Sequence, residues 1–143
     1  MLPFFVYGTL RPGEHNYARL LAGRTSAEAP AALAGAALFT EGPYPFLVTA
    51  PDLAGPGDLV RGDLVALPPA LYGPVLAQLD ALEGYVAGSA ANLYERVVIE
   101  VAAADGPRRA WVYVAGAAAL ARIRSGAMRR IPGGAWPGPA DQT

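Results

Sequence analysis

Residues 2–10 read LPFFVYGTL, a dense apolar run with aromatic residues. Such a run is typical of a buried strand, and we expect the strand to end at Gly8, where the loop residues TLRPGE follow. Glycine permits a positive φ and a close approach of a ligand to the main chain. Consecutive amides after a strand also form a concavity that fits a carboxylate. Tyr7, Gly8, Thr9 and Leu10 therefore fit either a carboxylate-binding loop or an ordinary turn.

The rest of the chain shows the patterns of both strands and helices. Further strands are expected at Ala27–Phe39, Phe46–Thr49, Val60–Leu67, Leu93–Val101 and Arg109–Val114. Helices are expected at Asn16–Leu21, Pro74–Leu82 and Ala117–Arg124, with Asn16 as an N-cap and Pro74 as a first helical residue. The uneven spacing of the strands disfavours a doubly wound parallel sheet. It indicates an α+β domain whose sheet is largely antiparallel or mixed.

Length and composition indicate a single domain. The chain has 143 residues, of which 53% are hydrophobic, and this favours a packed core over disorder. We expect the domain to span residues 1–130. The remaining residues, 131–143 (IPGGAWPGPADQT), are rich in proline and glycine, and we expect an extended or disordered tail. The sequence does not indicate an oligomeric state.

Charge and hydropathy restrict the partners and the location. The net charge of −1 lacks the basic excess expected of a nucleic-acid-binding protein. The opening residues have no basic n-region, and the apolar stretch Ala110–Ala121 is shorter than the ~20 residues that a membrane span needs. We therefore expect a cytoplasmic protein that binds neither nucleic acid nor membrane.

The inventory of reactive side chains excludes several kinds of chemistry. The chain has no cysteine, a single histidine (His15) and arginine at all eleven basic positions. Thiolate catalysis, a lysine Schiff base and a multi-histidine metal site are thus excluded. A lone histidine in a polar loop is usually solvated, and we expect this of His15. Carboxylates, tyrosines, arginines and main-chain amides remain as candidates.

One carboxylate is singled out by its place in LDALEGY, residues 79–85. Helical spacing places Glu83 on the flank of the apolar stripe, whereas Asp80 points further toward solvent. Glu83 is also the expected last helical residue, because Gly84 suits the left-handed C′ position. The helix dipole and partial burial would both raise the pKa of Glu83, and such a carboxyl group exchanges protons near neutral pH. A solvated glutamate at a helix end fits the same pattern.

The sequence LYER at residues 93–96 offers a third candidate. On a strand, Tyr94 and Arg96 share one face while Leu93 and Glu95 take the other. Tyr94 could hydrogen-bond a ligand, and Arg96 could pair with a carboxylate. A tyrosine packed across strands and a surface arginine would give the same pattern.

These segments together, in this order, resemble a known family. The segments are YGTLR, GPYPFLV, VRGDLVAL, LDALEGY and LYERVVIEV. Their sequence is similar to the gamma-glutamyl cyclotransferase-like family, including its avirulence-induced-protein-like and gamma-glutamylamine cyclotransferase branch. The resemblance covers roughly residues 3–115, and YGTL and LDALEGY are its most specific parts.

The resemblance implies a fold and a set of site residues. The fold would be a small, mostly antiparallel β-barrel with flanking helices. Main-chain amides of Tyr7, Gly8, Thr9 and Leu10 would bind the α-carboxylate of a small γ-glutamyl substrate, and Glu83 would be the acid–base. Tyr94 would line the pocket, and Tyr44 in the GPYP turn would help to close it. No metal or cofactor is implied.

The reaction implied is an intramolecular one. The α-amine of a γ-glutamyl compound attacks its own side-chain amide carbonyl and releases 5-oxoproline and a free amine or amino acid. Proximity, one carboxylate and backbone amides suffice for such a step. Two other functions remain open: a non-catalytic module that binds a small carboxylate, and a tailoring enzyme that removes a γ-glutamyl protecting group from a biosynthetic intermediate.

The sequence departs from the family pattern in two places. Some members end in glycine–acid–tryptophan, where this chain has Gly134-Ala135-Trp136. The second departure is the segment Gly84–Asn92, which is small and apolar and leaves the pocket rim and the choice of substrate open. In some relatives the glutamate lies closer to the tyrosine, which makes Glu95 the fallback acid. Strand alternation places Glu95 opposite Tyr94, so Glu83 remains the preferred candidate.

Overall fold

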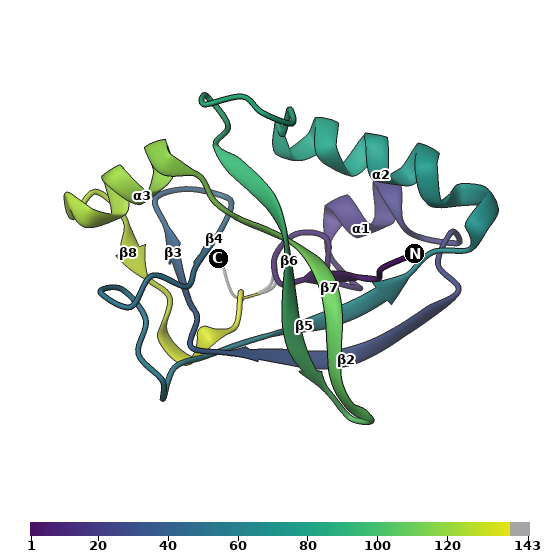
Figure 1. The fold of residues 1–143 in the computed structure, drawn as a ribbon, viewed down its shortest axis with the longest axis horizontal. Coiled ribbons are helices and arrows are strands. Elements are labelled where there is room, and N and C mark those ends of the chain that lie inside the picture. The colour runs from purple at the N-terminus through teal and green to yellow at the C-terminus, as the bar shows by residue number, and fades with distance from the viewer. Residues whose placement is uncertain (138–143) are drawn as a thin grey trace.

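A closed five-stranded barrel forms the centre of the molecule (Figure 1). The computed structural model describes residues 1–137. The strand order around the barrel is β1 (Phe4–Val6), β5 (Leu59–Ala66), β2 (Ala27–Ala34), β6 (Tyr94–Ala103) and β7 (Gly106–Ala115). Each neighbouring pair is antiparallel except β1 and β7, which run parallel and close the barrel where Phe4 lies opposite Trp111. The expected α+β class and mostly antiparallel barrel are confirmed.

A three-stranded antiparallel sheet lies beside the barrel. Its order is β4 (Phe46–Val48), β3 (Ala37–Thr40) and β8 (Arg129–Arg130). The prediction of one strand over Ala27–Phe39 is wrong, because this segment contributes to both sheets. Gly35, with φ of 70°, breaks the strand after Ala34 and redirects the chain from β2 into β3.

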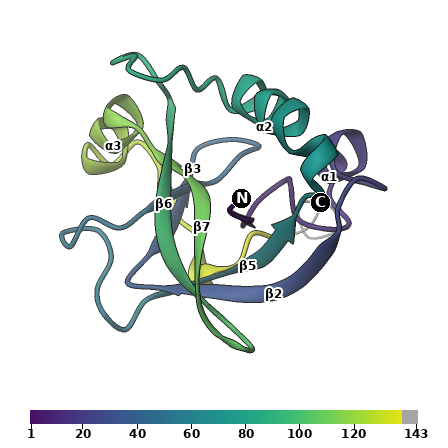
Figure 2. The same ribbon diagram turned by 45° about the vertical axis from the view of Figure 1, so that its right-hand side comes forward.

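Three α-helices in the described residues flank the barrel: α1 (His15–Leu20), α2 (Pro69–Glu83) and α3 (Ala117–Arg124). Helices α1 and α2 lie side by side, and α3 lies at the opposite end, as the views in Figures 1 and 2 agree. Two expected helix starts are wrong. The chain enters α2 at Pro69, with Pro74 inside the helix, and the N-cap of α1 is Glu14.

The hydrophobic core has two parts. One part fills the space between the barrel, α2 and α3, and includes Phe4, Leu79 and Ile123. The other lies between the barrel and the second sheet, and includes Leu47 and Val112. The strands are tightly packed where β1 crosses β5. The two cores hold β1 rigidly, and β1 leads directly into the YGTL loop.

Residues 131–136 contribute to the packing, although the sequence predicts that a tail begins there. Ile131 and Trp136 are buried, and Pro132–Gly134 forms a single 3₁₀ turn. Gly134 has a φ of 67°, and a Cβ at this position would lie 1.7 Å from the Leu59 main-chain oxygen. Packing therefore extends to at least Trp136. The rest of the predicted tail, residues 138–143, lies outside the described residues.

Candidate active site

A small hollow opens where β1 ends, between the barrel and the end of α2. It has about 380 Å³ of space, part of which is open to solvent. The residues that line it are Phe5, Val6, Tyr7, Gly8, Thr9, Leu10, Tyr44, Pro45, Glu83, Tyr94 and Tyr113. All seven candidate residues from the sequence (Tyr7, Gly8, Thr9, Leu10, Tyr44, Glu83 and Tyr94) thus surround one space, although their segments are far apart in the chain.

The YGTL loop presents main-chain donors to this hollow. Among residues 1–137, no acceptor pairs with the amide N–H groups of Gly8, Thr9 or Leu10. The loop is nevertheless firmly held from behind. The Thr9 carbonyl accepts from the Tyr17 amide at 3.1 Å, and the Thr9 hydroxyl oxygen accepts from the Asn16 side-chain amide at 2.8 Å. Asn16, expected to cap α1, instead fixes this loop.

Gly8 is required for a reason that the sequence did not predict. Its φ is not positive. A Cβ on Gly8 would lie 2.8 Å from Cγ of Pro45, closer than atoms pack, so only glycine lets the YGTL loop and the GPYP turn meet. The close approach, and not an unusual backbone conformation, explains this glycine.

Glu83 is the last residue of α2, as the sequence predicts. Gly84 follows in the left-handed conformation with φ of 67°, and its amide N–H bonds back to the Ala81 carbonyl at 3.2 Å. The Glu83 side chain is half-buried, lines the hollow, and forms no hydrogen bond to any residue in the described part of the chain. Burial raises the pKa of Glu83 from its ordinary value of 4.5 to about 7. The carboxyl group can therefore gain or lose a proton near neutral pH.

Three buried tyrosines form the wall around Glu83, and each hydroxyl donates its proton to a protein acceptor. Tyr7 donates to the Tyr113 main-chain oxygen, and Tyr94 donates to the Pro45 main-chain oxygen at 2.8 Å. Tyr113 donates to Oδ1 of Asp80 at 2.6 Å. Burial raises the pKa of each of the three phenols, and the nearby Glu83 charge raises it further. All three stay protonated in the working pH range of most proteins.

Four lining residues were not among the sequence candidates, and Tyr113 is the one of them with a polar side chain; the others are Phe5, Val6 and Pro45. Tyr113 lies opposite Arg96 in the β6–β7 hairpin, two residue pairs along from the pair that Tyr94 makes with Ala115. A signal was present in the sequence: the hairpin register, together with the side-chain period of two, places Tyr113 beside the LYER motif. No motif drew attention to it.

Tyr44 belongs to the mouth of the hollow. Its side chain is 46% exposed, yet it contributes to the lining. The Thr40 hydroxyl lies within hydrogen-bond distance of the Gly42 and Tyr44 main-chain oxygens, at 2.9 and 2.8 Å, and so holds the GPYP turn. Tyr94 also stacks on Phe46, with ring centroids 4.5 Å apart. The turn is therefore anchored on both sides of Tyr44.

Asp80 and Arg96 differ from expectation. Asp80 is paired and half-buried rather than turned to solvent: Nε of Arg96 lies 2.8 Å from its Oδ1, and the second contact, from Nη2 to Oδ2, is 3.2 Å. The Arg96 guanidinium also lies over the rings of Trp111 at 4.2 Å and Tyr85 at 5.1 Å. Arg96 is thus neither a free surface arginine nor a residue lining the hollow.

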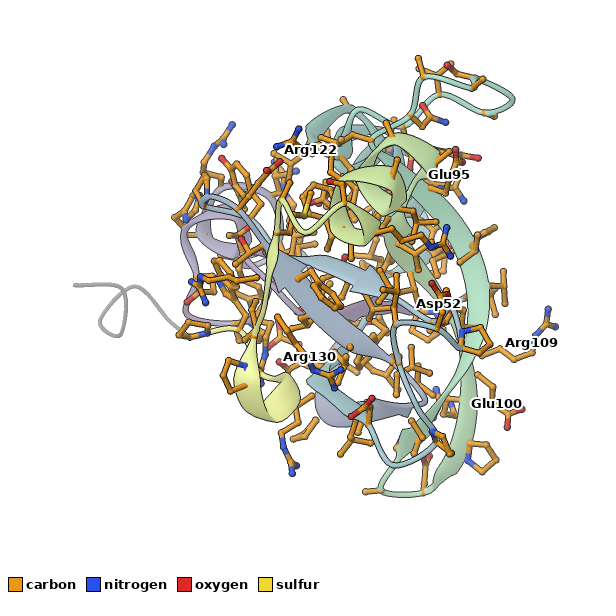
Figure 3. All side chains as sticks on the ribbon, turned by 90° about the vertical axis from the view of Figure 1, so that its left-hand side faces the viewer. Asp52, Glu95, Glu100, Arg109, Arg122 and Arg130 are labelled. Carbon is orange, nitrogen blue, oxygen red and sulfur yellow. The ribbon has the colours of Figure 1, made fainter. Side chains whose placement is uncertain are left out.

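The remaining candidates lie elsewhere. Glu95, the fallback acid, is on the outer side of β6, near Asn92, and does not line the hollow (Figure 3). His15 is exposed. In residues 1–137, no group of three histidine, aspartate or glutamate side chains is arranged to hold a metal ion. Within the same range, no helix has both the length and the hydropathy of a membrane span.

The fold defines a class of small β-barrel domains with flanking helices and a hollow at the end of the first strand. The sequence matches the profile of the family described as gamma-glutamyl cyclotransferase, AIG2-like, over residues 4–138. The chain therefore belongs to this family, as its motifs predicted. The chain has Gly134-Ala135-Trp136 where some members of the family have glycine–acid–tryptophan. Trp136 is nevertheless buried.

One relative is similar enough in sequence to compare chemistry. The chain is 32% identical over 111 residues to the gamma-L-glutamyl-butirosin B gamma-glutamyl cyclotransferase of Niallia circulans. The match covers 77% of this chain and 64% of that enzyme, so the chain spans a little under two-thirds of its length.

Solved structures show the same fold at lower sequence identity. YkqA from Bacillus subtilis superposes with a TM-score of 0.64 and 24% identity, over 94% of this chain and 39% of that one. An AIG2-like protein from Mus musculus superposes with a TM-score of 0.61 and 22% sequence identity, over 84% of this chain and 82% of that one. The yeast gamma-glutamyl cyclotransferase specific to glutathione superposes with a TM-score of 0.59 and 16% sequence identity, over 80% of this chain and 69% of that one.

Proposed function

We propose that the protein is a γ-glutamyl cyclotransferase that converts a γ-glutamyl compound into 5-oxoproline and a free amine or amino acid. One observation carries the proposal. A carboxyl group with a pKa of about 7 and no hydrogen-bond partner among the described residues lines the same hollow as three unpaired main-chain N–H groups. The first can move a proton near neutral pH, and the second can hold an anion.

The substrate would be positioned by its α-carboxylate at the amides of Gly8, Thr9 and Leu10. Its α-ammonium group would then lie near Glu83, which as a carboxylate accepts one proton. The freed amine nitrogen attacks the γ-carbonyl carbon, and a C–N bond closes the five-membered ring. Because nucleophile and carbonyl belong to one molecule, orientation supplies much of the rate.

Collapse of the tetrahedral intermediate completes the reaction. The ring nitrogen of this intermediate still carries one proton more than the lactam nitrogen does. Glu83 delivers its first proton to the departing nitrogen as the original γ-amide C–N bond breaks. It then takes the second proton from the ring nitrogen and passes it to the released amine, which leaves as an ammonium ion toward the open mouth beside Tyr44. An amide of the YGTL loop that the α-carboxylate leaves free would stabilise the negative charge on the carbonyl oxygen. The carboxylate is thus restored to its starting state after each turnover.

A tailoring role is the second candidate, and the relative from Niallia circulans favours it. That enzyme is described as acting on gamma-L-glutamyl-butirosin B. The same chemistry with a large amine as the leaving group requires an open exit from the hollow, and the exposed Tyr44 lies at such an exit. A binding module without catalysis is the third function to be tested.

The test is a substrate panel with 5-oxoproline as the measured product. Purified protein is incubated with γ-glutamyl amino acids, small γ-glutamyl amines and γ-glutamyl derivatives of bulky amines. We expect release from at least one class, with kcat/KM rising as pH increases through about 7, where Glu83 loses its proton. Glu83→Gln should lower kcat by at least ~10²-fold, whereas Glu95→Gln, outside the hollow, should not.

Each outcome separates the candidates. Turnover only of bulky amine substrates supports the tailoring role. Ligand binding without 5-oxoproline in every class supports the binding module. Turnover that is unchanged in Glu83→Gln but lost in Glu95→Gln would transfer the acid–base role to Glu95 and contradict the mechanism above.

A further inference from the structure

The hollow has two chemically different walls. The YGTL loop offers unpaired N–H donors. A second part of the lining, here called the second wall, contains Glu83 and the phenols of Tyr94 and Tyr113. The single protons of these two phenols are already donated to the Pro45 main-chain oxygen and to Asp80. A phenol whose proton is committed can only accept a further hydrogen bond. The second wall therefore consists of acceptors.

Asp80 determines the state of Tyr113. It lies one helical turn before Glu83 on α2, outside the lining of the hollow, and accepts the Tyr113 proton at 2.6 Å. A hydrogen bond to an ionised acceptor is shorter and stronger than a neutral one, so the Tyr113 proton is held firmly away from the site.

Arg96 holds Asp80 in turn. Its guanidinium makes two contacts to the carboxylate, at 2.8 and 3.2 Å, and lies between Asp80 and the face of Trp111. Such paired and stacked geometry fixes the position and orientation of the Asp80 carboxylate. The negative charge is also compensated locally. Asp80, Arg96 and Trp111 thus form a support behind Tyr113 that the proposed chemical steps do not use.

We infer that Asp80 is a positioning residue that makes Tyr113 an acceptor, so that Tyr113 and Tyr94 together bind the primary α-ammonium group of the ligand. The inference rests on the proposed function, whose reaction uses the free α-amine, and it names the residues that recognise that amine. The site takes zwitterionic γ-glutamyl compounds with a free α-amine. Compounds that lack the amine, or carry an acyl group on it, leave buried acceptors unpaired and bind weakly.

The experiment compares three ligands by calorimetry: L-glutamine, its des-amino analogue 4-carbamoylbutanoate, and N-acetyl-L-glutamine. We expect the wild-type protein to bind L-glutamine at least ~10-fold more tightly than either of the others, as one hydrogen bond to a charged group is worth. Tyr113→Phe and Asp80→Asn should remove most of that preference. Their affinity for 4-carbamoylbutanoate should stay within about 2-fold of wild type, since the YGTL loop is untouched.

A matched control tests whether loss of any tyrosine hydroxyl has the same effect. Tyr72 donates its hydroxyl proton to the Leu2 main-chain oxygen at 2.7 Å, outside the hollow, so Tyr72→Phe should keep the full preference. A purely structural role for Asp80 would weaken all three ligands equally, and that result overturns the inference. So does a wild-type protein with no preference for the free amine. Failure of the proposed function would be a different result. In that case no 5-oxoproline forms in the substrate panel, while calorimetry still shows the preference for L-glutamine.

Discussion

Glu83 should make the protein less stable as pH rises, and Glu83→Gln should remove that dependence. The pKa of the carboxyl group is about 7 in the folded protein, against an ordinary value of 4.5. Below pH 4.5 the Glu83 carboxyl group is protonated in both the folded and the unfolded protein, so its ionisation does not affect stability. Between these values the unfolded chain has lost the proton while the folded chain keeps it, so the free energy of unfolding falls with pH.

The size of the effect follows from the shift. At about 1.4 kcal/mol per pKa unit, the difference between 4.5 and about 7 corresponds to about 3 kcal/mol. We expect Glu83→Gln to be more stable than wild type by up to that amount at pH 8.5, relative to the difference between the two proteins at pH 4.5. The comparison of two pH values cancels the constant effect of replacing a carboxyl group by an amide.

The assay is urea unfolding followed by circular dichroism at pH 4.5, 6, 7 and 8.5 for both proteins. Glu100→Gln is the matched control, because Glu100 is exposed on the outer face of β6, where Figure 3 shows it projecting away from the barrel. The free energy of unfolding of Glu100→Gln, relative to wild type, should not increase with pH. A difference between Glu83→Gln and wild type that stays constant across the four pH values would refute the reasoning, since the carboxyl group would then titrate alike in both states.

Three further substitutions test other parts of the site. Gly8→Ala places a Cβ 2.8 Å from Pro45 and should cost about 1–3 kcal/mol of stability in urea unfolding, whereas Gly73→Ala, with no atom within 4 Å, should be neutral or stabilising. Arg96→Leu leaves Asp80 uncompensated one turn from Glu83, and should move the acidic limb of the pH profile of kcat/KM to higher pH; an unmoved limb contradicts this. Gly134→Ala, 1.7 Å from the Leu59 oxygen at a positive φ, should lower the free energy of unfolding by more than about 2 kcal/mol, and a smaller loss would mean that this segment does not pack as described.

Sequence patterns located most of the elements because each has a local cause. The aromatic run before Gly8, the β6–β7 hairpin and the helix Ala117–Arg124 all follow from periodicity and turn residues within the segment itself. The single strand predicted at Ala27–Phe39 is wrong because the alanine-rich pattern did not mark the break at Gly35. Only the tertiary pairing of Ala27–Ala34 with β5, and of Ala37–Thr40 with β4, separates its two halves.

The candidate site was predictable where a motif marked it. Glu83 and the YGTL loop were found because a helix-end glycine and a strand-end glycine have sequence signatures. Tyr113 and the pairing of Asp80 with Arg96 were not found, since they depend on how α2 lies against the β6–β7 hairpin. The solvent-facing role expected of Asp80 came from the helix alone, which contains no information about the arginine that packs beside it.

The pairing of Asp80 also bears on why Glu83 titrates where it does. Burial raises the pKa of Glu83, and a second carboxyl group, that of Asp80, lies one helical turn away on α2. The Asp80 charge is balanced by Arg96 outside the hollow. The helix thus supplies two carboxyl groups with separate tasks. Asp80 pairs with Arg96 and accepts the Tyr113 hydroxyl proton, whereas Glu83, half-buried in the lining of the hollow, is the group that we propose exchanges a proton with the substrate.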